Sequence, residues 1–372
     1  MFKQHQLPQW FRSLSQVALH RQLLSTSVAF LVLAAPTIIN LPGSKLLAQN
    51  VVSKDLDAAS FFQQGVTRYN RQDLQGAEDA FRKALRRDSK LAIARNYLGN
   101  ILLEQNRLDV AIQEYAEAIR LNPNYADAHY NLGLALHKQG QREAAITAYR
   151  RSLVIDAKMP AAQYNLGLAL YEQGQIPDAI AAYQEAINLD GSNANAYFNL
   201  AIALQDQGLL PEAISAYQQA LQRDPSNPST YNNLGSLMAM NGQTAEAIAV
   251  YQQAIRQNPK NAVAFYNLGV TLYNQGQIKQ ANSAFKRARK EYEDQGNIAQ
   301  ADKLGVLMVQ IAQMLAPQTA QANKPSTPAA LSTTTNTEKP NQPQAPQATP
   351  DTPAPIIIPI SAQPQPTSMN LP

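Results

Sequence analysis

The chain repeats itself at a fixed spacing, and this period constrains its fold more than any other feature. The stretch YNLGLALHKQG begins at Tyr130, and YNLGLALYEQG begins at Tyr164. Counted from Ala58 as position 1, seven equal blocks follow one another without a gap over 58–295, the first being 58–91. A fixed period of this kind is typical of repeat arrays, in which each repeat contacts only its neighbours. We therefore expect one elongated repeat domain rather than several globular ones.

Small and aromatic residues recur at fixed positions of the blocks. Position 8 is Gly in six blocks and Ala201 in the other, position 20 is always Ala, and position 24 is always Tyr or Phe. Positions 4, 7, 8 and 11 have the spacing of an apolar stripe on a helix. We expect two antiparallel helices per block that approach closely at the small residues. The ring at position 24 should pack toward the next helix pair.

Glycine at position 15 marks the end of the first helix. A glycine there adopts the left-handed backbone that ends a helix, and Asn106 is the next-best residue for that role. Pro177 and Pro211 follow shortly afterwards and fit the first turn of a second helix, where the missing N–H has no cost. The position-15 glycines are Gly140, Gly174, Gly208, Gly242 and Gly276.

These positions resemble the tetratricopeptide repeat, and the resemblance covers residues 58–295. It implies an all-α fold, a right-handed α-α superhelical solenoid of helix pairs. In the first block the polar residues Gln64 and Arg68 occupy positions that are buried in the family. This is expected of an end block with one face in water. Residues 298–315 predict a final helix, so 296–315 is interpreted as a C-terminal capping helix.

The N-terminal residues 1–48 are interpreted as a signal peptide. They carry four basic residues and no acidic one, with an apolar core before LLAQN. This pattern is typical of a secretory signal, and we expect cleavage after Ala48. The alternative is an uncleaved N-terminal anchor, which would be the protein's one membrane contact. The predicted location is periplasmic or extracellular. The leader also resembles those of exported cyanobacterial proteins, for which the thylakoid lumen is an alternative.

The C-terminal residues 316–372 are predicted to be a disordered tail. They contain 13 of the 23 prolines and no aromatic residue, so they lack the apolar surface that a folded core needs. The stretch PAPIIIPIS at 353–361 is either a docking motif for a partner or an apolar spot without a function.

Composition excludes several classes of function. The chain has 31 basic and 27 acidic residues, but four of the basic residues lie in the leader, so the rest is balanced. A neutral body gives no reason to expect nucleic acid as a partner. The sequence contains no Cys, and we find no catalytic triad, metal-ligand spacing or phosphate-binding loop. We therefore expect a protein that is not an enzyme and uses no cofactor or metal.

Asparagine recurs at position 6, and it supplies the candidate site. At 100° per residue, position 6 lies about 150° from the centre of the apolar stripe. In tetratricopeptide proteins this face of the first helix lines the concave side, where ligands bind. The candidate ligand-binding residues are Asn131, Asn165, Asn199, Asn233 and Asn267 with Tyr130, Tyr164, Tyr171, Tyr266 and Tyr273.

A row of amides suits an extended peptide, because each amide offers both donors and an acceptor. The row resembles the repeat domain of O-linked N-acetylglucosamine transferases, where asparagines at the same position line the groove. The alternative is that each Asn bonds to water or to a neighbouring repeat.

These features predict a non-catalytic scaffold that binds an extended peptide or a partner protein in the concave groove, outside the cytoplasm. The alternative is a targeting or substrate-recruiting subunit of an envelope enzyme such as a glycosyltransferase. Because both ends of the array look capped, we expect a monomer.

Overall fold

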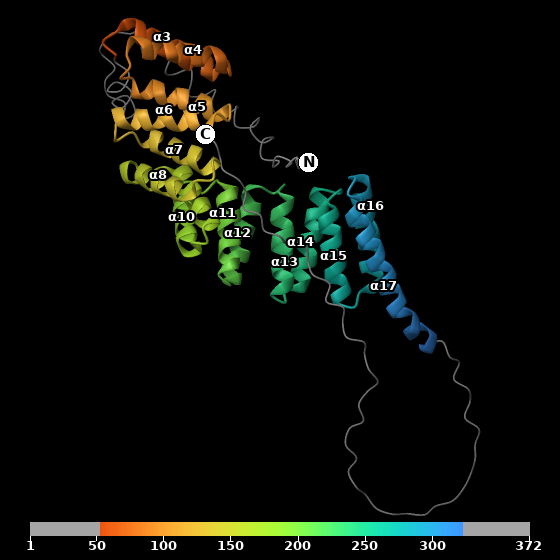
Figure 1. The fold of residues 1–372 in the computed structure, drawn as a ribbon. Coiled ribbons are helices and arrows are strands. Elements are labelled where there is room, and N and C mark those ends of the chain that lie inside the picture. Colours follow the sequence, from red (N-terminus) through yellow and green to blue (C-terminus); the bar gives the residue numbers. More distant parts are fainter. Residues whose placement is uncertain (1–52, 323–372) are drawn as a thin grey trace, which may run out of the picture. The chain divides into compact units, whose positions relative to one another are not determined.

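The computed structural model describes residues 53–322, which form fifteen helices and, over the same range, no strand (Figure 1). The predicted leader and the 353–361 stretch lie outside the described residues. The helices are α3 (Leu56–Asn70), α4 (Leu74–Arg87), α5 (Ala92–Glu104), α6 (Leu108–Leu121), α7 (Ala126–Lys138), α8 (Arg142–Ile155), α9 (Pro160–Glu172), α10 (Ile176–Leu189), α11 (Ala194–Asp206), α12 (Leu210–Arg223), α13 (Pro228–Met240), α14 (Thr244–Gln257), α15 (Ala262–Asn274), α16 (Ile278–Asp294) and α17 (Ile298–Ala322).

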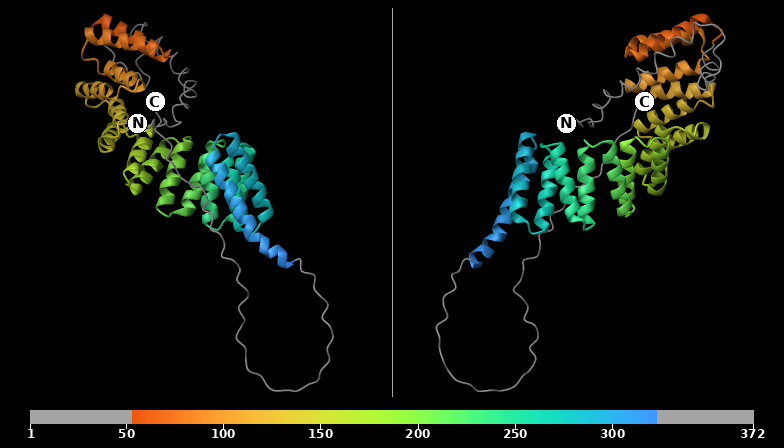
Figure 2. Two further views of the ribbon diagram at one scale, coloured as in Figure 1. Left: turned by 45° about the vertical axis from the view of Figure 1, so that its right-hand side comes forward. Right: turned by 180° about the vertical axis from the view of Figure 1, so that it is seen from behind.

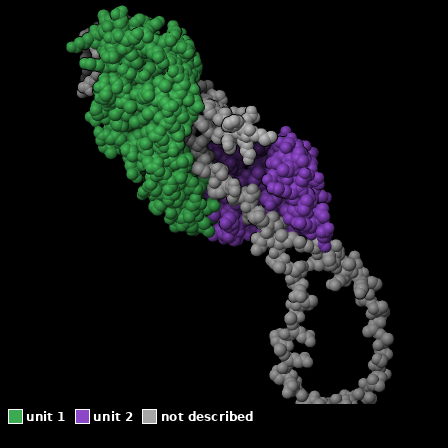
Figure 3. Space-filling view, in the orientation of Figure 1, with its two compact units in different colours: residues 1–216, 366–372 green, residues 217–365 purple. Residues whose placement is uncertain are grey.

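The helices associate in antiparallel pairs that follow the period of the sequence. Helix α3 packs on α4, α5 on α6 and α7 on α8, and within each unit described below a pair also contacts the next (Figures 1 and 2). The described residues belong to two compact units, 53–216 and 217–322, with the boundary inside α12 (Figure 3). Each unit is built from the same pairs. The predicted class, an all-α solenoid of tetratricopeptide helix pairs, is confirmed.

The close approach within a pair depends on glycine at position 8. A Cβ atom added to Gly133 would lie 2.5 Å from Cε1 of Tyr149, the ring at position 24 of the same block. Tyr149 is completely buried. The expected contact with the next pair also occurs, because the ring of Phe81 stacks on Tyr97 with centroids 5.2 Å apart. In the first block, the position-24 ring therefore joins its own helix pair to the following one.

The predicted helix ends are confirmed by the backbone. Gly140 has a φ of 86° and Asn106 a φ of 61°, both in the left-handed region. After Gly140, the N–H of Gln141 donates to the carbonyl of Leu136 at 2.9 Å. This bond satisfies one of the carbonyl groups that the end of a helix leaves without an intrahelical partner.

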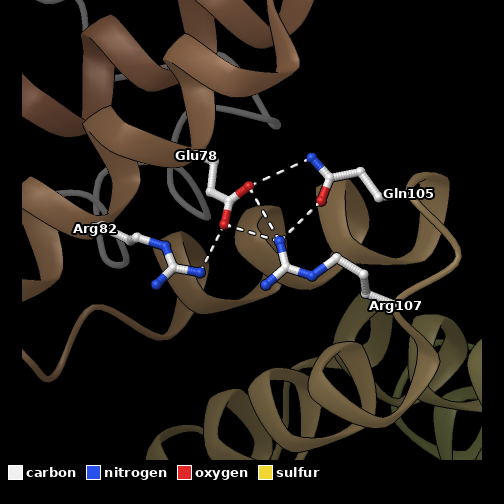
Figure 4. A network of polar contacts seen from close by, with 4 residues as sticks. All are labelled: Glu78, Arg82, Gln105 and Arg107. Atoms are coloured by element: carbon white, nitrogen blue, oxygen red, sulfur yellow. Dashed lines mark hydrogen bonds and ion pairs between the residues drawn. The ribbon is translucent and has the colours of Figure 1, made fainter.

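The first block meets the second through a network around Glu78 (Figure 4). Glu78, on α4, accepts hydrogen bonds from Arg82 at 2.6 Å and from Arg107 at 3.2 Å, and Gln105 donates at 3.3 Å. Gln105 and Arg107 come from the turn between α5 and α6. Although burial acts to raise the pKa of Glu78, these donors outweigh it and lower the pKa below its ordinary value.

Helix α17 packs on α16 through Ala301, Leu304 and Ile311, which are 0–2% exposed. It begins at Ile298 but continues past the predicted end at residue 315 to Ala322. The predicted boundary of the tail at 316 is therefore too early by seven residues. Extending an existing helix is much easier than starting one, and the added stretch APQTAQA is rich in alanine, the best helix former.

Candidate functional site

Hydrogen bonds between side chains at positions 6 and 5 join consecutive first helices of unit 1. Nδ2 of Asn165 on α9 donates to the hydroxyl of Tyr130 on α7 at 3.0 Å. Nδ2 of Asn199 on α11 donates in the same way to the hydroxyl of Tyr164 at 3.0 Å. Each donor lies one block and one position beyond its acceptor. The asparagine therefore ties its repeat to the preceding repeat.

The joint between the second and third blocks uses asparagine in place of tyrosine. Nδ2 of Asn131 lies 3.0 Å from Oδ1 of Asn96, at position 5, and 3.0 Å from Oδ1 of Asn100. Asn100 also accepts from the hydroxyl of Tyr115 at 2.8 Å. The position-6 amide again joins two consecutive repeats, but its acceptor is an asparagine oxygen instead of a tyrosine hydroxyl.

The expectation that the position-6 side chains stand on an open face is wrong. The exposed fractions are 5% for Asn131, 0% for Asn165, 1% for Asn199, 6% for Asn233 and 0% for Asn267. The prediction considered one helix pair alone, whereas α7, α9 and α11 each also contact the preceding first helix. The alternative, a bond to the neighbouring repeat, is confirmed for the three asparagines of unit 1. Their part in ligand binding stays a prediction.

The amide of Asn165 has one atom that the protein leaves without a partner. Its Nδ2 donates to Tyr130 and to the carbonyl of Ala161, both at 3.0 Å. Both N–H groups of the amide are therefore used. Its Oδ1 is buried and accepts no hydrogen bond. Most buried polar side-chain atoms in proteins have a partner, so an unfilled acceptor at this position requires an explanation.

The tyrosines predicted for the site divide into two groups. Tyr130 and Tyr164 are 4% and 0% exposed, whereas Tyr171, Tyr266 and Tyr273 are half-buried. Burial raises the pKa of Tyr130 and outweighs the opposing effect of the bond from Asn165. The Tyr130 hydroxyl therefore keeps its proton and acts as a neutral acceptor for the amide.

A second row of contacts joins position 12 of one repeat to position 13 of the next. The pairs are Tyr69–Glu104 at 2.5 Å, His137–Glu172 at 2.9 Å and Tyr171–Asp206 at 2.5 Å. Of these residues, the sequence analysis predicted only Tyr171. The sequence does contain a signal for the three carboxylates of this row, because position 13 is acidic in three blocks. A carboxylate is unfavourable at the C-terminal end of a helix, so its recurrence there indicates a contact outside the helix.

Glu172 is the most connected residue of this second row. It lies 2.9 Å from Nε2 of the buried His137 and accepts from Nε of Arg142 at 2.7 Å. Burial acts to raise the pKa of Glu172, but these two partners outweigh it and lower the pKa. The carboxylate is thus held ionised between the third and fourth repeats.

Residues 53–322 lack the features of two other kinds of site. Over this range, no three His, Cys, Asp or Glu side chains are grouped so that they could hold a metal ion. Nor does any helix in the described part combine the length and apolar character needed to cross a bilayer.

The fold and these contacts define an all-helical protein built from repeated helix pairs. Models described as TPR repeat or tetratricopeptide repeat match the chain and together cover 99–294, more than half of it. The chain therefore belongs to the tetratricopeptide repeat family. Members are generally scaffolds for protein interactions, and their fold is typically non-catalytic. The matched segments are 99–140, 135–174, 239–276, 164–228, 216–249 and 263–294.

Solved structures of other repeat proteins are similar to this chain. The C-terminal part of a TPR repeat-containing protein from Cytophaga hutchinsonii is 17% identical, with a TM-score of 0.56 over 64% of this chain and 98% of that one. YrrB, described as a TPR protein with an unusual peptide-binding site, is 26% identical, with a TM-score of 0.45 over 49% and 94%. MamA is 26% identical, with a TM-score of 0.42 over 45% and 92%. No curated protein matches the chain.

Proposed function

We propose that this protein is a non-catalytic scaffold that acts outside the cytoplasm. It binds an extended segment of a partner protein along α7, α9 and α11, which are the first helices of the third, fourth and fifth blocks. The observation that carries the proposal is the unfilled acceptor of Asn165, in the middle of the position-6 row.

An unfilled buried acceptor is unfavourable in the free protein. A buried polar group without a partner costs about 1–3 kcal/mol. Because Asn165 is 0% exposed, a backbone N–H of the partner segment would remove this cost only after the side chains that cover Oδ1 move aside. The bonds to Tyr130 and Ala161 already fix the amide, so the cost of ordering on binding falls on the side chains that cover it. The free energy gained from this hydrogen bond comes from the partner's backbone and does not depend on the partner's side chains.

The spacing of the repeats suits an extended chain. Packed helices lie about 8–10 Å apart, and an extended strand rises about 3.3 Å per residue. A partner segment would then advance about three residues for each repeat that it crosses. The position-6 asparagines of unit 1 lie on three consecutive first helices, so the bound segment would be about nine residues long.

Two parts of the proposal rest on the sequence and the family. Action outside the cytoplasm is supported by the basic and then apolar residues 1–48, with a small residue at the expected cleavage point. The absence of catalysis is supported by the family's general character and by a sequence without a catalytic motif.

The test is a capture experiment with residues 49–372 as bait and an extract of the exported compartment. Native bait is compared with Asn165→Ala, which removes the acceptor. The control is Tyr115→Phe, which removes a buried hydrogen bond to Asn100 at 2.8 Å and keeps every position-6 amide. Circular dichroism verifies that all three baits fold.

We expect a partner that native bait and Tyr115→Phe retain and Asn165→Ala loses. If Asn165→Ala retains the partner as well as native bait does, binding along the position-6 row is contradicted. If native bait captures nothing, the scaffold function itself is contradicted.

A further inference from the structure

Helix α17 and the end of α16 line an open hollow of about 640 Å³ in unit 2. Val306 and Val309 form its apolar part and are 58% and 55% exposed. Arg289 of α16 and Gln310 and Gln313 of α17 stand around them. The last helix of a repeat array normally turns a polar face to water. This helix instead presents two neighbouring valines beside a hollow, a small apolar area that a short apolar segment would cover.

A glycine opens the hollow. The backbone of Gly305 does not need glycine, because it is not in the left-handed region, and an added Cβ would meet only Arg289, at 3.6 Å or more. Such distances are ordinary contacts. Glycine in the interior of a helix costs about 1 kcal/mol relative to alanine. The missing side chain at Gly305 lowers the stability of α17 and leaves the hollow empty.

We propose that the hollow binds the chain's own C-terminal segment 353–361, PAPIIIPIS. Fifty residues follow Ala322, and they contain six Ile and Leu residues in total. Four of these six lie within 356–360. Apart from this stretch, the remainder of the C-terminal chain offers only isolated aliphatic residues, so this segment is the one suited to cover two exposed valines.

The connecting chain has the right length for the segment to return. About 33 residues separate Ala322 from Ile356, and eight of them are prolines, which extend a linker beyond the roughly 30 Å of a glycine-rich chain of that length. The distance from Val306 to Ala322 is about 24 Å along a helix. The linker is therefore long enough for the segment to reach the hollow, and the tether raises the local concentration of the segment there.

Hydrogen-bonding groups on the segment and around the hollow are complementary. Three of the nine residues 353–361 are prolines, which have a carbonyl acceptor but no N–H donor. The side chains of Arg289, Gln310 and Gln313 supply donors at the rim, which also carries the carboxylate of Asp302. Nε of Arg289 pairs with Glu293 at 3.0 Å, so its other guanidinium N–H groups are the donors for the segment. Proline also restricts the backbone before binding, so the segment loses less conformational entropy when it docks.

The test uses the absence of cysteine from the chain, since every disulfide formed will be a designed one. The variant Gln310→Cys/Ser361→Cys carries one thiol at the hollow and one at the end of the segment. The control Gln310→Cys/Thr349→Cys carries its second thiol nearer to α17 along the chain, outside the segment. Both are made in the chain 49–372 and oxidised under mild conditions. The rates of intramolecular disulfide formation are compared.

We expect the Ser361→Cys pair to form the disulfide about ten-fold faster than the Thr349→Cys pair. Adding Gly305→Leu, which fills the hollow, or changing Ile356, Ile357 and Ile358 to Ser should abolish the difference. Circular dichroism verifies that Gly305→Leu folds. Equal rates in the two pairs would overturn the proposal. Disulfide-linked dimers in place of the intramolecular product would overturn it in favour of a second copy as the occupant.

Discussion

The side-chain amide of Asn165 and the hydroxyl of Tyr130 lie 3.0 Å apart and join two consecutive repeats of unit 1. Asn199 and Tyr164 repeat the arrangement one block later. An amide has two donors and one acceptor, and at Asn165 the donors serve the protein's own fold. Its acceptor has no hydrogen-bond partner within the protein. One side chain thus links the stability of the array to its proposed function.

Breaking this link should destabilise the protein. Tyr130→Phe leaves a buried amide donor without its acceptor, and Asn165→Ala removes both bonds of the amide. We expect each change to lower the free energy of unfolding by about 1–3 kcal/mol. The measurement is urea denaturation followed by circular dichroism. Because the two residues share one bond, the double variant should lose less than the sum of the two single changes. Strict additivity would show that the bond is absent in solution.

Two glycines should respond in opposite ways to the same substitution. A Cβ at Gly133 would lie 2.5 Å from the buried Tyr149 ring, so Gly133→Ala should destabilise the protein by about 1–3 kcal/mol. A Cβ at Gly305 meets nothing closer than 3.6 Å, so Gly305→Ala should stabilise the helix by up to about 1 kcal/mol. Thermal denaturation of both variants provides the comparison. Equal losses would contradict the account of position 8.

The Glu78 network should make the protein sensitive to acid. Because the pKa of Glu78 in the folded protein is below its ordinary value of 4.5, the ionised form stabilises the folded state. This contribution is fully present above pH 4.5 and is lost as the pH falls through the lowered pKa. The urea midpoint of the native protein should therefore fall more steeply below pH 4.5 than that of Glu78→Gln. Parallel curves would show that the network does not hold the carboxylate ionised.

The leader should be removed on export. Expressed with its leader in a bacterium that exports proteins, the chain should be recovered from the exported fraction with Gln49 as its first residue. N-terminal sequencing provides the measurement. A product that retains residues 1–48 and sediments with membranes would support the uncleaved anchor. Recovery in the cytoplasm would contradict both interpretations.

The helix pairs could be predicted because their determinants are local and periodic. Gly133 and Tyr149 belong to the two helices of one block, and a small residue faces a ring at every occurrence of the pattern. The left-handed ends at Gly140 and Asn106 could be predicted from residue type, whereas Gln72, at the same position of the first block, has a φ of 62° without being Gly or Asn. These features need no knowledge of how repeats stack.

The burial of the position-6 amides could not be predicted in the same way. The helical wheel placed Asn165 away from its own helix pair, which is correct for one repeat in isolation. The neighbour that covers it, Tyr130, belongs to the preceding block, and its approach depends on how one pair packs on the next. The adjacency of Tyr and Asn at positions 5 and 6 contained the signal, because Tyr130 serves the Asn of the following block.

The central claim is that Asn165 supplies an acceptor to a bound protein segment. The most direct measurement is isothermal titration of the captured partner segment into native protein, Asn165→Ala and Tyr115→Phe. We expect Asn165→Ala to weaken binding by about ten-fold or more, because it removes a buried hydrogen bond worth about 1–3 kcal/mol, while Tyr115→Phe binds as the native protein does. Equal affinity of Asn165→Ala and native protein would contradict this claim.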